Sequence, residues 1–192
     1  MRWVIGIAAV AGLLIGVQRN FKFSLQDGWH ARFRVPCGSN ERRAIVSLKT
    51  LASAQTDFRA NDRDQDGKAN FWRADIAGLY ALAPGEGPAI KLIELSLAAA
   101  DDRPVADLSA YTLRSPMSGY EFRALRHANE DPKALDPNRY AYGAYPALPN
   151  AGQYQFVLDE TRSIWHCTAN GRRSVDVFPT EEELRLQWSR VD

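Results

Sequence analysis

The sequence contains few of the residues from which catalytic and zinc sites are built. It has three histidines, and none lies four positions from another histidine or from a glutamate, so the helical zinc-hydrolase motif is absent. Its two cysteines form no CxxC pair, and neither a GxSxG motif nor a common glycine-rich phosphate-binding motif occurs. We therefore predict that the protein is not an enzyme.

Charge of one sign is not concentrated anywhere along the chain. The 24 lysines and arginines nearly balance the 23 aspartates and glutamates, and no basic run is present. A protein that binds nucleic acid presents a basic patch or stripe to the phosphates. The sequence therefore predicts no nucleic-acid partner.

The two cysteines, Cys37 and Cys167, lie far apart in the sequence. In an oxidising compartment they would form a disulfide that ties the stalk to the last strand. The alternative is two unrelated thiols. An enzyme that uses Cys167 together with a histidine such as His127 is the least supported interpretation.

One long apolar run is present, from Trp3 to Val17, with Arg2 and Arg19 on its two sides. As a helix it would reach roughly 22 Å, shorter than a hydrocarbon core of about 30 Å unless the flanking arginines extend it. No small-x-small cleavage site follows the run, which favours an uncleaved signal anchor over residues 1–20. A cleaved signal peptide and a buried helix are the alternatives.

Three segments follow from this reading of the N-terminus. The anchor is followed by a polar linker of mixed charge over residues 21–40 and by a head domain over residues 41–192. We predict a single-pass protein of the cell membrane, and the positive charges on both sides of the apolar run leave its orientation open.

The head begins with the strongest helix signal in the sequence, in the stretch SNERRAIVSLKTLASAQTDFRAN. Its apolar residues recur at steps of three and four, which places them on one helix face. These residues are Ala44, Ile45, Leu48, Leu51, Ala52 and Phe58, and the polar Gln55 lies on the same face.

Further elements are predicted after this helix. PAIKLIELSLAAADD, residues 88–102, is apolar on nearly every side and predicts a second, buried helix. From residue 112 the short aromatic stretches GYEFRAL, RYAYGAYP, YQFVLD and SIWHC predict an antiparallel β-meander. Thr180 and Glu183 have the spacing of a capping box, which predicts a short terminal helix. The predicted fold class is therefore α+β.

The order of these elements and several stretches of the sequence resemble those of a known protein family. An apolar N-terminal segment that leads into ERRAIVSLKTLASAQTDFR, and then into an antiparallel sheet, resembles type IV pilins and pseudopilins. More specifically, SLKTLASAQTDFRANDRDQDG, FWRADIAGLY, IKLIELSLAAAD, GYEFRAL, YAYGAYP and FPTEEELRLQWSRVD are similar to exported pilin-like proteins of planctomycete-type bacteria. The resemblance covers residues 41–192. It implies a pilin-like head on the extracytoplasmic, periplasmic side of the cell membrane, with a membrane or stalk helix before it.

The resemblance also implies a role and partners. The role is structural or interaction-mediating, and the partners are the membrane, through the N-terminal helix, and other pilin-like subunits or secretion components. The sequence departs from pilins at Gly6, which is followed by IAAVAGLLIGV without the acidic residue through which pilin subunits assemble. No activity is implied.

The stretch NDRDQDGKANFWRAD, residues 61–75, fits most of the calcium-loop pattern D-x-[DN]-x-[DN]-G. Three aspartates at alternate positions precede a glycine, and a backbone carbonyl and an asparagine follow at positions seven and nine. The predicted ligands of a structural calcium ion are Asp62, Asp64, Asp66, Lys68, Asn70 and, from outside the pattern, Asp75.

The pattern fails at position twelve, where Arg73 replaces the usual bidentate carboxylate. Asp75 is the nearest carboxylate that would substitute for it. The alternative to a calcium site is a polar turn whose carboxylates are neutralised by Arg63, Lys68 and Arg73.

A second function class rests on tyrosines. Tyr140, Tyr142 and Tyr145 lie along one predicted strand. Exposed together, they would make a periplasmic binding module for a peptide or a glycan. Buried together, they would only be part of the core.

Overall fold

The computed structural model describes residues 38–169 and 175–191, which belong to one compact unit. The predicted anchor over residues 1–20, most of the predicted linker and Cys37 lie outside these residues, and so does the predicted Cys37–Cys167 disulfide. Within the described ranges, no helix is long and apolar enough to cross a membrane.

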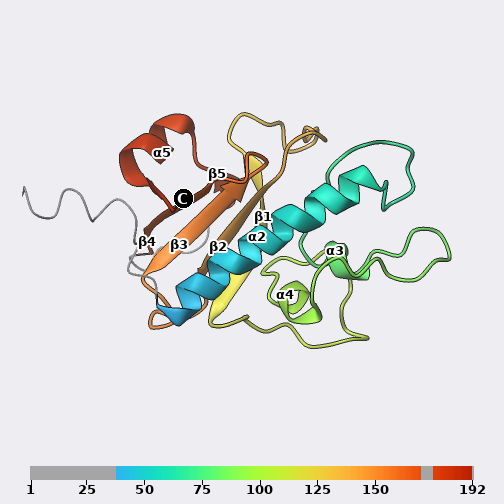
Figure 1. The fold of residues 1–192 in the computed structure, drawn as a ribbon, viewed down its shortest axis with the longest axis horizontal. Coiled ribbons are helices and arrows are strands. Elements are labelled where there is room, and N and C mark those ends of the chain that lie inside the picture. The colour runs from blue at the N-terminus through green and yellow to red at the C-terminus, as the bar shows by residue number, and fades with distance from the viewer. Residues whose placement is uncertain (1–37, 170–174, 192) are drawn as a thin grey trace, which may run out of the picture. The chain divides into compact units, whose positions relative to one another are not determined.

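The amphipathic helix predicted at the start of the head is present as α2, Ser39–Ala60. It has Glu41 in its first turn and Arg59 in its last turn, so each charge opposes the partial charge of its helix end. In Figure 1, α2 runs diagonally across one face of the sheet. Its buried face consists of Glu41, Ala44, Ser47, Leu48, Leu51, Ala52, Ala54, Gln55 and Phe58.

The described residues form one six-stranded sheet with the order β5-β1-β2-β3-β4-β6. Consecutive strands from β1 to β4 pair antiparallel, and β6 pairs antiparallel with β4. β5 runs parallel to β1, so the sheet is mixed. The strands are β1 (Tyr120–His127), β2 (Ala141–Pro146), β3 (Tyr154–Asp159), β4 (Ile164–Thr168), β5 (Val177–Phe178) and β6 (Ser189–Arg190).

The two faces of the sheet are covered differently because successive side chains of a strand point to opposite faces. The face toward α2 carries large, fully buried residues such as Phe122, Tyr142 and Phe156, which pack with the apolar side of α2. The opposite face holds a smaller cluster around Val157 and Leu184, where Leu184 comes from the terminal helix.

The terminal helix is α5, Glu181–Gln187, and the capping box predicted for it is confirmed. The Thr180 hydroxyl accepts from the Glu183 N–H at 3.3 Å, and the Glu183 carboxylate accepts from the Thr180 N–H at 2.8 Å. Reciprocal bonds of this kind satisfy two amides that the first turn leaves without an intrahelical partner.

The buried second helix predicted over residues 88–102 is wrong. Only Leu95–Ala99 forms a helix there (α4), and a second short helix precedes it at Gly78–Ala81 (α3). The N–H groups of residues 90–92 donate instead to carbonyls of residues 79–82, and Lys91 has a positive φ of 48°, so this part of the apolar run is not helical. A continuous apolar run does not distinguish a buried helix from a buried extended segment.

The predicted fold class as a whole is therefore contradicted. Instead of an α+β head with a buried second helix and a purely antiparallel meander, the described residues form mainly a mixed six-stranded sheet. They include no long apolar helix. β5 and β6 are two residues each, too short to leave a periodic pattern in the sequence.

Candidate metal centre

The Asp loop, residues 61–70, joins the end of α2 to an exit arm, residues 71–73. Its backbone turns sharply, since Asp62, Gln65 and Gly67 have positive φ values of 45°, 59° and 79°. Glycine adopts this conformation without a steric penalty, and aspartate is among the residues that enter it more readily than most. The turns determine which side chains of the loop meet.

The three predicted aspartate ligands are brought together by the loop. Asp62, Asp64 and Asp66 each offer one carboxylate oxygen, and these oxygens lie within 4.8 Å of one another. Backbone amides orient two of the carboxylates: the Gly67 N–H donates to Asp62 Oδ2 at 3.1 Å, and the Lys68 N–H donates to Asp66 Oδ1 at 2.8 Å.

Asn70 also belongs to this cluster. Its side-chain amide donates to Asp66 Oδ2 at 3.1 Å. Its Oδ1, together with Oδ1 of Asp62 and Oδ1 of Asp64, is shielded from solvent and has no hydrogen-bond partner among the described residues. A buried acceptor without a donor costs about 1–3 kcal/mol, so three such oxygens in one short loop need a physical reason.

Two of the three cations that would neutralise a polar turn are engaged elsewhere. Arg63 pairs with Asp57 in α2, with Nε 2.7 Å from Oδ1. Arg73 pairs with Glu130, with Nη1 2.6 Å from Oε1. Only Lys68 remains beside the cluster, and its Nζ lies 3.8 Å from Asp66 Oδ2 on an exposed side chain. The backbone carbonyl of Lys68, the predicted ligand at position seven, accepts the Asn70 N–H at 3.0 Å.

The crowding of these carboxylates has an electrostatic consequence. Partial burial, and then the neighbouring charge of Asp66, raise the pKa of the Asp64 carboxyl above its ordinary value. A bound cation would have the opposite effect, because it favours the ionised form. The loop is therefore an arrangement that gains from a positive charge at its centre.

Asp75, the predicted ligand from outside the pattern, lies elsewhere. Its side chain is buried, and Oδ1 accepts from the Trp72 indole at 3.0 Å and the Gly78 N–H at 2.8 Å. Oδ2 accepts from the N–H groups of Val105 and Ala106, both at 2.7 Å. Four donors satisfy this carboxylate, so Asp75 organises the start of α3 and is not one of the clustered oxygens.

The exit arm is attached to α2 by Gln55, which is completely buried. Gln55 Oε1 accepts the Trp72 N–H at 3.0 Å, and Gln55 Nε2 donates to the Trp72 carbonyl at 2.5 Å. The same Nε2 donates to the Tyr142 hydroxyl of β2, whose pKa is raised by burial. One buried amide thus connects the helix, the arm and the sheet.

The tyrosines of the binding-module alternative are not exposed. Tyr140, Tyr142 and Tyr145 are 3%, 1% and 7% accessible, and Tyr142 belongs to the core under α2. The strand therefore presents no aromatic patch to a ligand.

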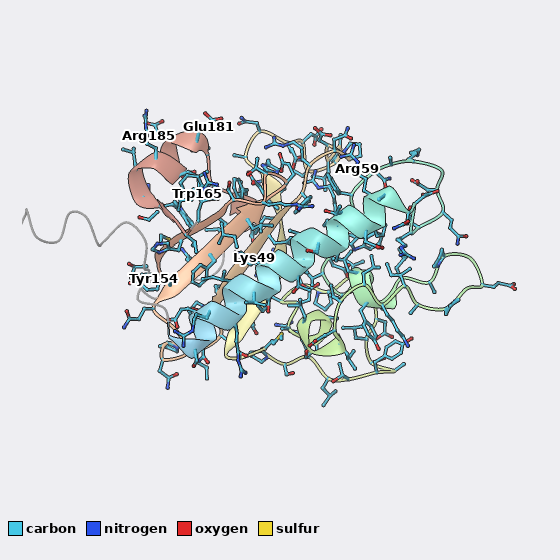
Figure 2. The ribbon with its side chains drawn as sticks, in the orientation of Figure 1. Lys49, Arg59, Tyr154, Trp165, Glu181 and Arg185 are labelled. Atoms are coloured by element: carbon cyan, nitrogen blue, oxygen red, sulfur yellow. The ribbon has the colours of Figure 1, made fainter. Side chains whose placement is uncertain are left out.

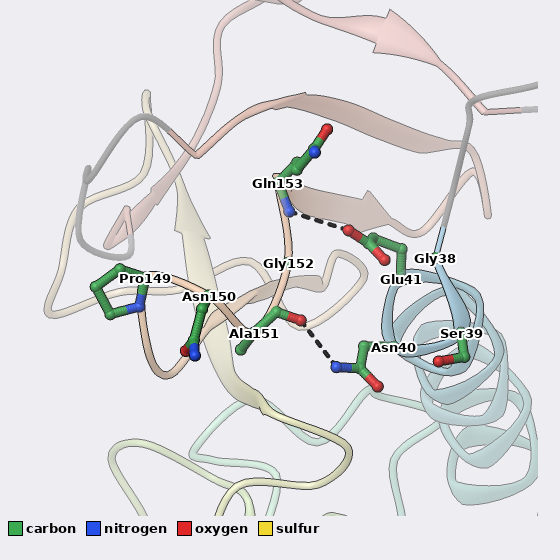
Figure 3. Close-up of a pocket in the computed structure, with 9 residues that line it drawn as sticks. All are labelled: Gly38, Ser39, Asn40, Glu41, Pro149, Asn150, Ala151, Gly152 and Gln153. Carbon is green, nitrogen blue, oxygen red and sulfur yellow. Dashed lines mark hydrogen bonds between the residues drawn. The ribbon is translucent and has the colours of Figure 1, made fainter.

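Two pockets lie away from the Asp loop. One, of about 410 Å³, opens at the start of α2, where Glu41 accepts the Gln153 N–H and Asn40 donates to the Ala151 carbonyl (Figure 3). The other lies between Trp165 of the sheet and Glu181 and Arg185 of α5, which are labelled in Figure 2. Neither pocket has a cysteine or a histidine among its described lining residues.

The pair suggested for an enzyme, Cys167 with His127, is not assembled. Cys167 lies in β4 and accepts from Gln155 Nε2 at 3.0 Å, whereas His127 ends β1 and lies beside Arg139. β2 and β3 separate these two strands in the sheet.

Comparison with known proteins yields no relative. No family model, no curated protein and no solved structure matches this chain. The interpretation of the Asp loop therefore depends on its own geometry.

Two residues that support the loop were missed from the sequence. Gln55 had a detectable signal, because it is a polar residue on the apolar side of α2. Glu130 had none, because it lies in a polar segment far along the chain from Arg73.

Proposed function

We propose that this protein is a membrane-anchored, extracytoplasmic protein with a structural or interaction role, and that a calcium ion held by the Asp loop stabilises its head. The observation that carries the calcium assignment is the group of shielded, unpartnered oxygens from Asp62, Asp64 and Asn70. The anchor and the location are supported by the apolar run from Trp3 to Val17 and by the resemblance to pilins and pseudopilins.

The ligand set would consist of oxygens only, which suits a hard cation such as calcium. Calcium takes six to eight oxygen ligands, so water would complete the shell. Arg73 at position twelve does not oppose the ion, because Glu130 neutralises its guanidinium. The protein ligands proposed are the carboxylates of Asp62, Asp64 and Asp66, the side-chain oxygen of Asn70 and the backbone carbonyl of Lys68.

The ion would act structurally. It would remove the repulsion among three carboxylates and connect the end of α2 to the exit arm. Since the bidentate carboxylate of position twelve is missing, we expect weak binding, with a dissociation constant of about 10⁻⁴–10⁻³ M as in extracellular calcium modules.

Thermal unfolding of the full-length protein tests the calcium assignment. At a calcium concentration ten times the dissociation constant, binding to the folded state alone adds about 1.4 kcal/mol, which raises the melting temperature by roughly 3–6 °C. Magnesium should have a smaller effect, because it requires a tighter octahedral site. A melting temperature that is the same in EDTA, calcium and magnesium would refute the assignment.

A matched variant makes this test specific. Asp64→Asn removes a proposed ligand charge, whereas Asp107→Asn removes the charge of an exposed aspartate in another loop. Calcium should stabilise the Asp107 variant as it does the unmodified protein, and it should not stabilise the Asp64 variant.

The location is tested separately by fractionation. The full-length protein should sediment with membranes, and a protease added outside spheroplasts should digest the head. A chain found dissolved in the cytosol would contradict the anchored arrangement.

A further inference from the structure

The β1–β2 connection, residues 128–139, rests on the exit arm of the Asp loop. The Phe71 N–H donates to the Pro137 carbonyl at 2.9 Å, and Arg73 Nη1 donates to the Asp136 carbonyl at 2.8 Å. Both donors lie within three positions of Asn70, the last proposed ligand. A change in the Asp loop would therefore reach the connection through a very short segment of chain.

The end of α2 contacts the same connection. Arg59, in the last turn, donates to Asn138 Oδ1 at 3.1 Å, and its guanidinium carbon lies 4.8 Å from the centre of the Phe71 ring. Figure 2 places Arg59 at this end of the helix. The connection is thus supported by residues on both sides of the Asp loop, one before it and two after it.

The strongest of these contacts is the ion pair between Arg73 and Glu130. Both side chains are buried, at 8% and 7% exposed, and the two guanidinium nitrogens lie 2.6 and 2.8 Å from the two carboxylate oxygens. Paired charges removed from water are rigidly placed, because breaking the pair leaves an uncompensated charge. Arg73 therefore holds Glu130 in one position relative to the exit arm.

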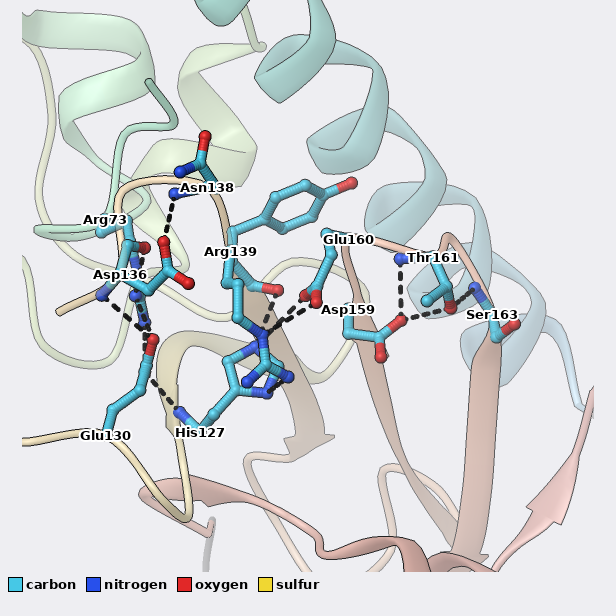
Figure 4. Close-up of polar contacts among 11 residues, drawn as sticks. Arg73, His127, Glu130, Asp136, Asn138, Arg139, Asp159, Glu160, Thr161 and Ser163 are labelled. Atoms are coloured by element: carbon cyan, nitrogen blue, oxygen red, sulfur yellow. Dashed lines mark hydrogen bonds and ion pairs between the residues drawn. The ribbon is translucent and has the colours of Figure 1, made fainter. Parts of the chain in front are cut away.

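Glu130 in turn organises the connection itself (Figure 4). Its Oε2 accepts the His127 N–H at 2.8 Å, and its Oε1 accepts the Asp136 N–H at 3.2 Å. The first amide belongs to the last residue of β1, and the second lies in the last third of the connection. Glu130 thus closes the connection as a loop, and Arg73 fixes that loop to the arm.

We propose that calcium occupancy of the Asp loop controls the order of the β1–β2 connection, with Arg73 as the link between them. This inference rests on the calcium site proposed above. It gives a role to the residue that breaks the calcium pattern: Arg73 occupies position twelve, turns away from the loop oxygens and transmits the state of the loop to the connection. Most of the connection is exposed, so the ion would regulate a surface available to partners.

Hydrogen–deuterium exchange of the full-length protein, in EDTA and in calcium, tests the inference. If opening of the connection requires loss of the ion, then calcium at ten times its dissociation constant slows exchange of the coupled amides by about tenfold. The amides to follow lie in peptides that cover residues 127–139. Calorimetric titration of calcium on the same sample reports binding independently.

The double variant Arg73→Met with Glu130→Gln removes the link without leaving a buried charge unpaired. It should bind calcium as the unmodified protein does, but calcium should no longer slow exchange in residues 127–139. The single variant Asn138→Ala is the control, because it removes only the contact with Arg59 and keeps the Arg73–Glu130 pair. In this variant calcium should still slow exchange in residues 127–139, which would show that a substitution in the connection does not by itself abolish the effect.

The outcomes separate the two proposals. Calcium binding with slower exchange in the connection, lost in the double variant, supports the inference. Calcium binding that protects residues 61–73 but leaves residues 127–139 unchanged overturns the inference and leaves the calcium site intact. Absence of calcium binding overturns both.

Discussion

The head contains two groups of aspartates in opposite hydrogen-bonding environments. Asp75 and Asp101 are each 1% exposed, and both oxygens of each carboxylate accept N–H groups, such as those of Ile76 and Ala77 on Asp101 Oδ2. In the Asp loop, Oδ1 of Asp62 and Oδ1 of Asp64 have no donor among the described residues.

The two groups differ in whether N–H groups donate to all of the carboxylate oxygens. Where a buried aspartate organises a turn, backbone amides are supplied to it, as at the start of α3. In the Asp loop, amides donate to Asp62 Oδ2 and to both oxygens of Asp66, whereas Oδ1 of Asp62 and Oδ1 of Asp64 have no donor within the described part of the chain. Removing an aspartate should therefore have different consequences in the two groups.

Asp75→Ala should have the largest effect. It leaves four donors without their acceptor, two of them on residues 105 and 106, and we expect a loss of about 3–4 kcal/mol in the free energy of unfolding. Urea unfolding in EDTA and in calcium measures this loss. The loss should be the same in both, and a loss that appears only in calcium would mean that Asp75 is a ligand after all.

The second largest effect is expected from a fall in pH, which should weaken the Arg73–Glu130 ion pair beside the exit arm. The Arg73 guanidinium lowers the pKa of Glu130 from 4.5 to about 2. The unfolded chain therefore takes up this proton first as the pH falls, so the stabilisation is complete above about pH 5 and is lost toward pH 2, by about 3 kcal/mol.

Unfolding at a series of pH values, with Glu130→Gln as the comparison, isolates this contribution. The variant should show a shallower loss of stability between about pH 5 and pH 2. Parallel curves for the two proteins would contradict the assignment of the low pKa to this pair.

Asp64→Asn should have an effect of intermediate size that depends on calcium. In EDTA the variant should be as stable as the unmodified protein or slightly more stable, because a like-charge repulsion is removed. In calcium at ten times the dissociation constant it should lack the increment of about 1.4 kcal/mol. A large loss of stability in EDTA would place Asp64 in the same class as Asp75.

Lys68→Gln should have the smallest effect. Its ammonium lies 3.8 Å from Asp66 on a side chain that is 76% exposed, so it competes only weakly with an ion. Removal should strengthen calcium binding by about twofold or less, and the gain should shrink as salt is added. Weaker calcium binding in this variant would indicate that the side chain supports the loop in a way that the pair with Asp66 does not explain.

The sequence predicted the elements whose signal is local. The three-to-four spacing of apolar residues found α2, and aromatic stretches between glycine and proline found the positions of β1 to β4. The second helix failed because an apolar run has no period. β5 and β6 could not be found because two residues carry no pattern.

In the candidate site, too, the features set by neighbouring residues were predictable and those set by distant residues were not. The alternate positions of Asp62, Asp64 and Asp66 in the sequence predicted that these residues lie together. Their carboxylate oxygens do lie near one another, because the turn residues of the loop fix their relative positions. The roles of Arg73 and Asp75 were not predictable, since their partners at Glu130 and Val105 come from distant parts of the chain. Charge alone did not distinguish a carboxylate of the Asp cluster from a carboxylate that accepts backbone amides.

A residue-resolved calcium titration followed by NMR tests the central claim most directly. Addition of calcium to the chelated, full-length protein should shift the backbone amide of Gly67 and the side-chain amide of Asn70, and both should saturate with one dissociation constant of about 10⁻⁴–10⁻³ M. Signals of Asp75 and Asp101 should move little. Shifts that do not saturate, or that are spread over exposed carboxylates with the Asp loop unaffected, would contradict the account.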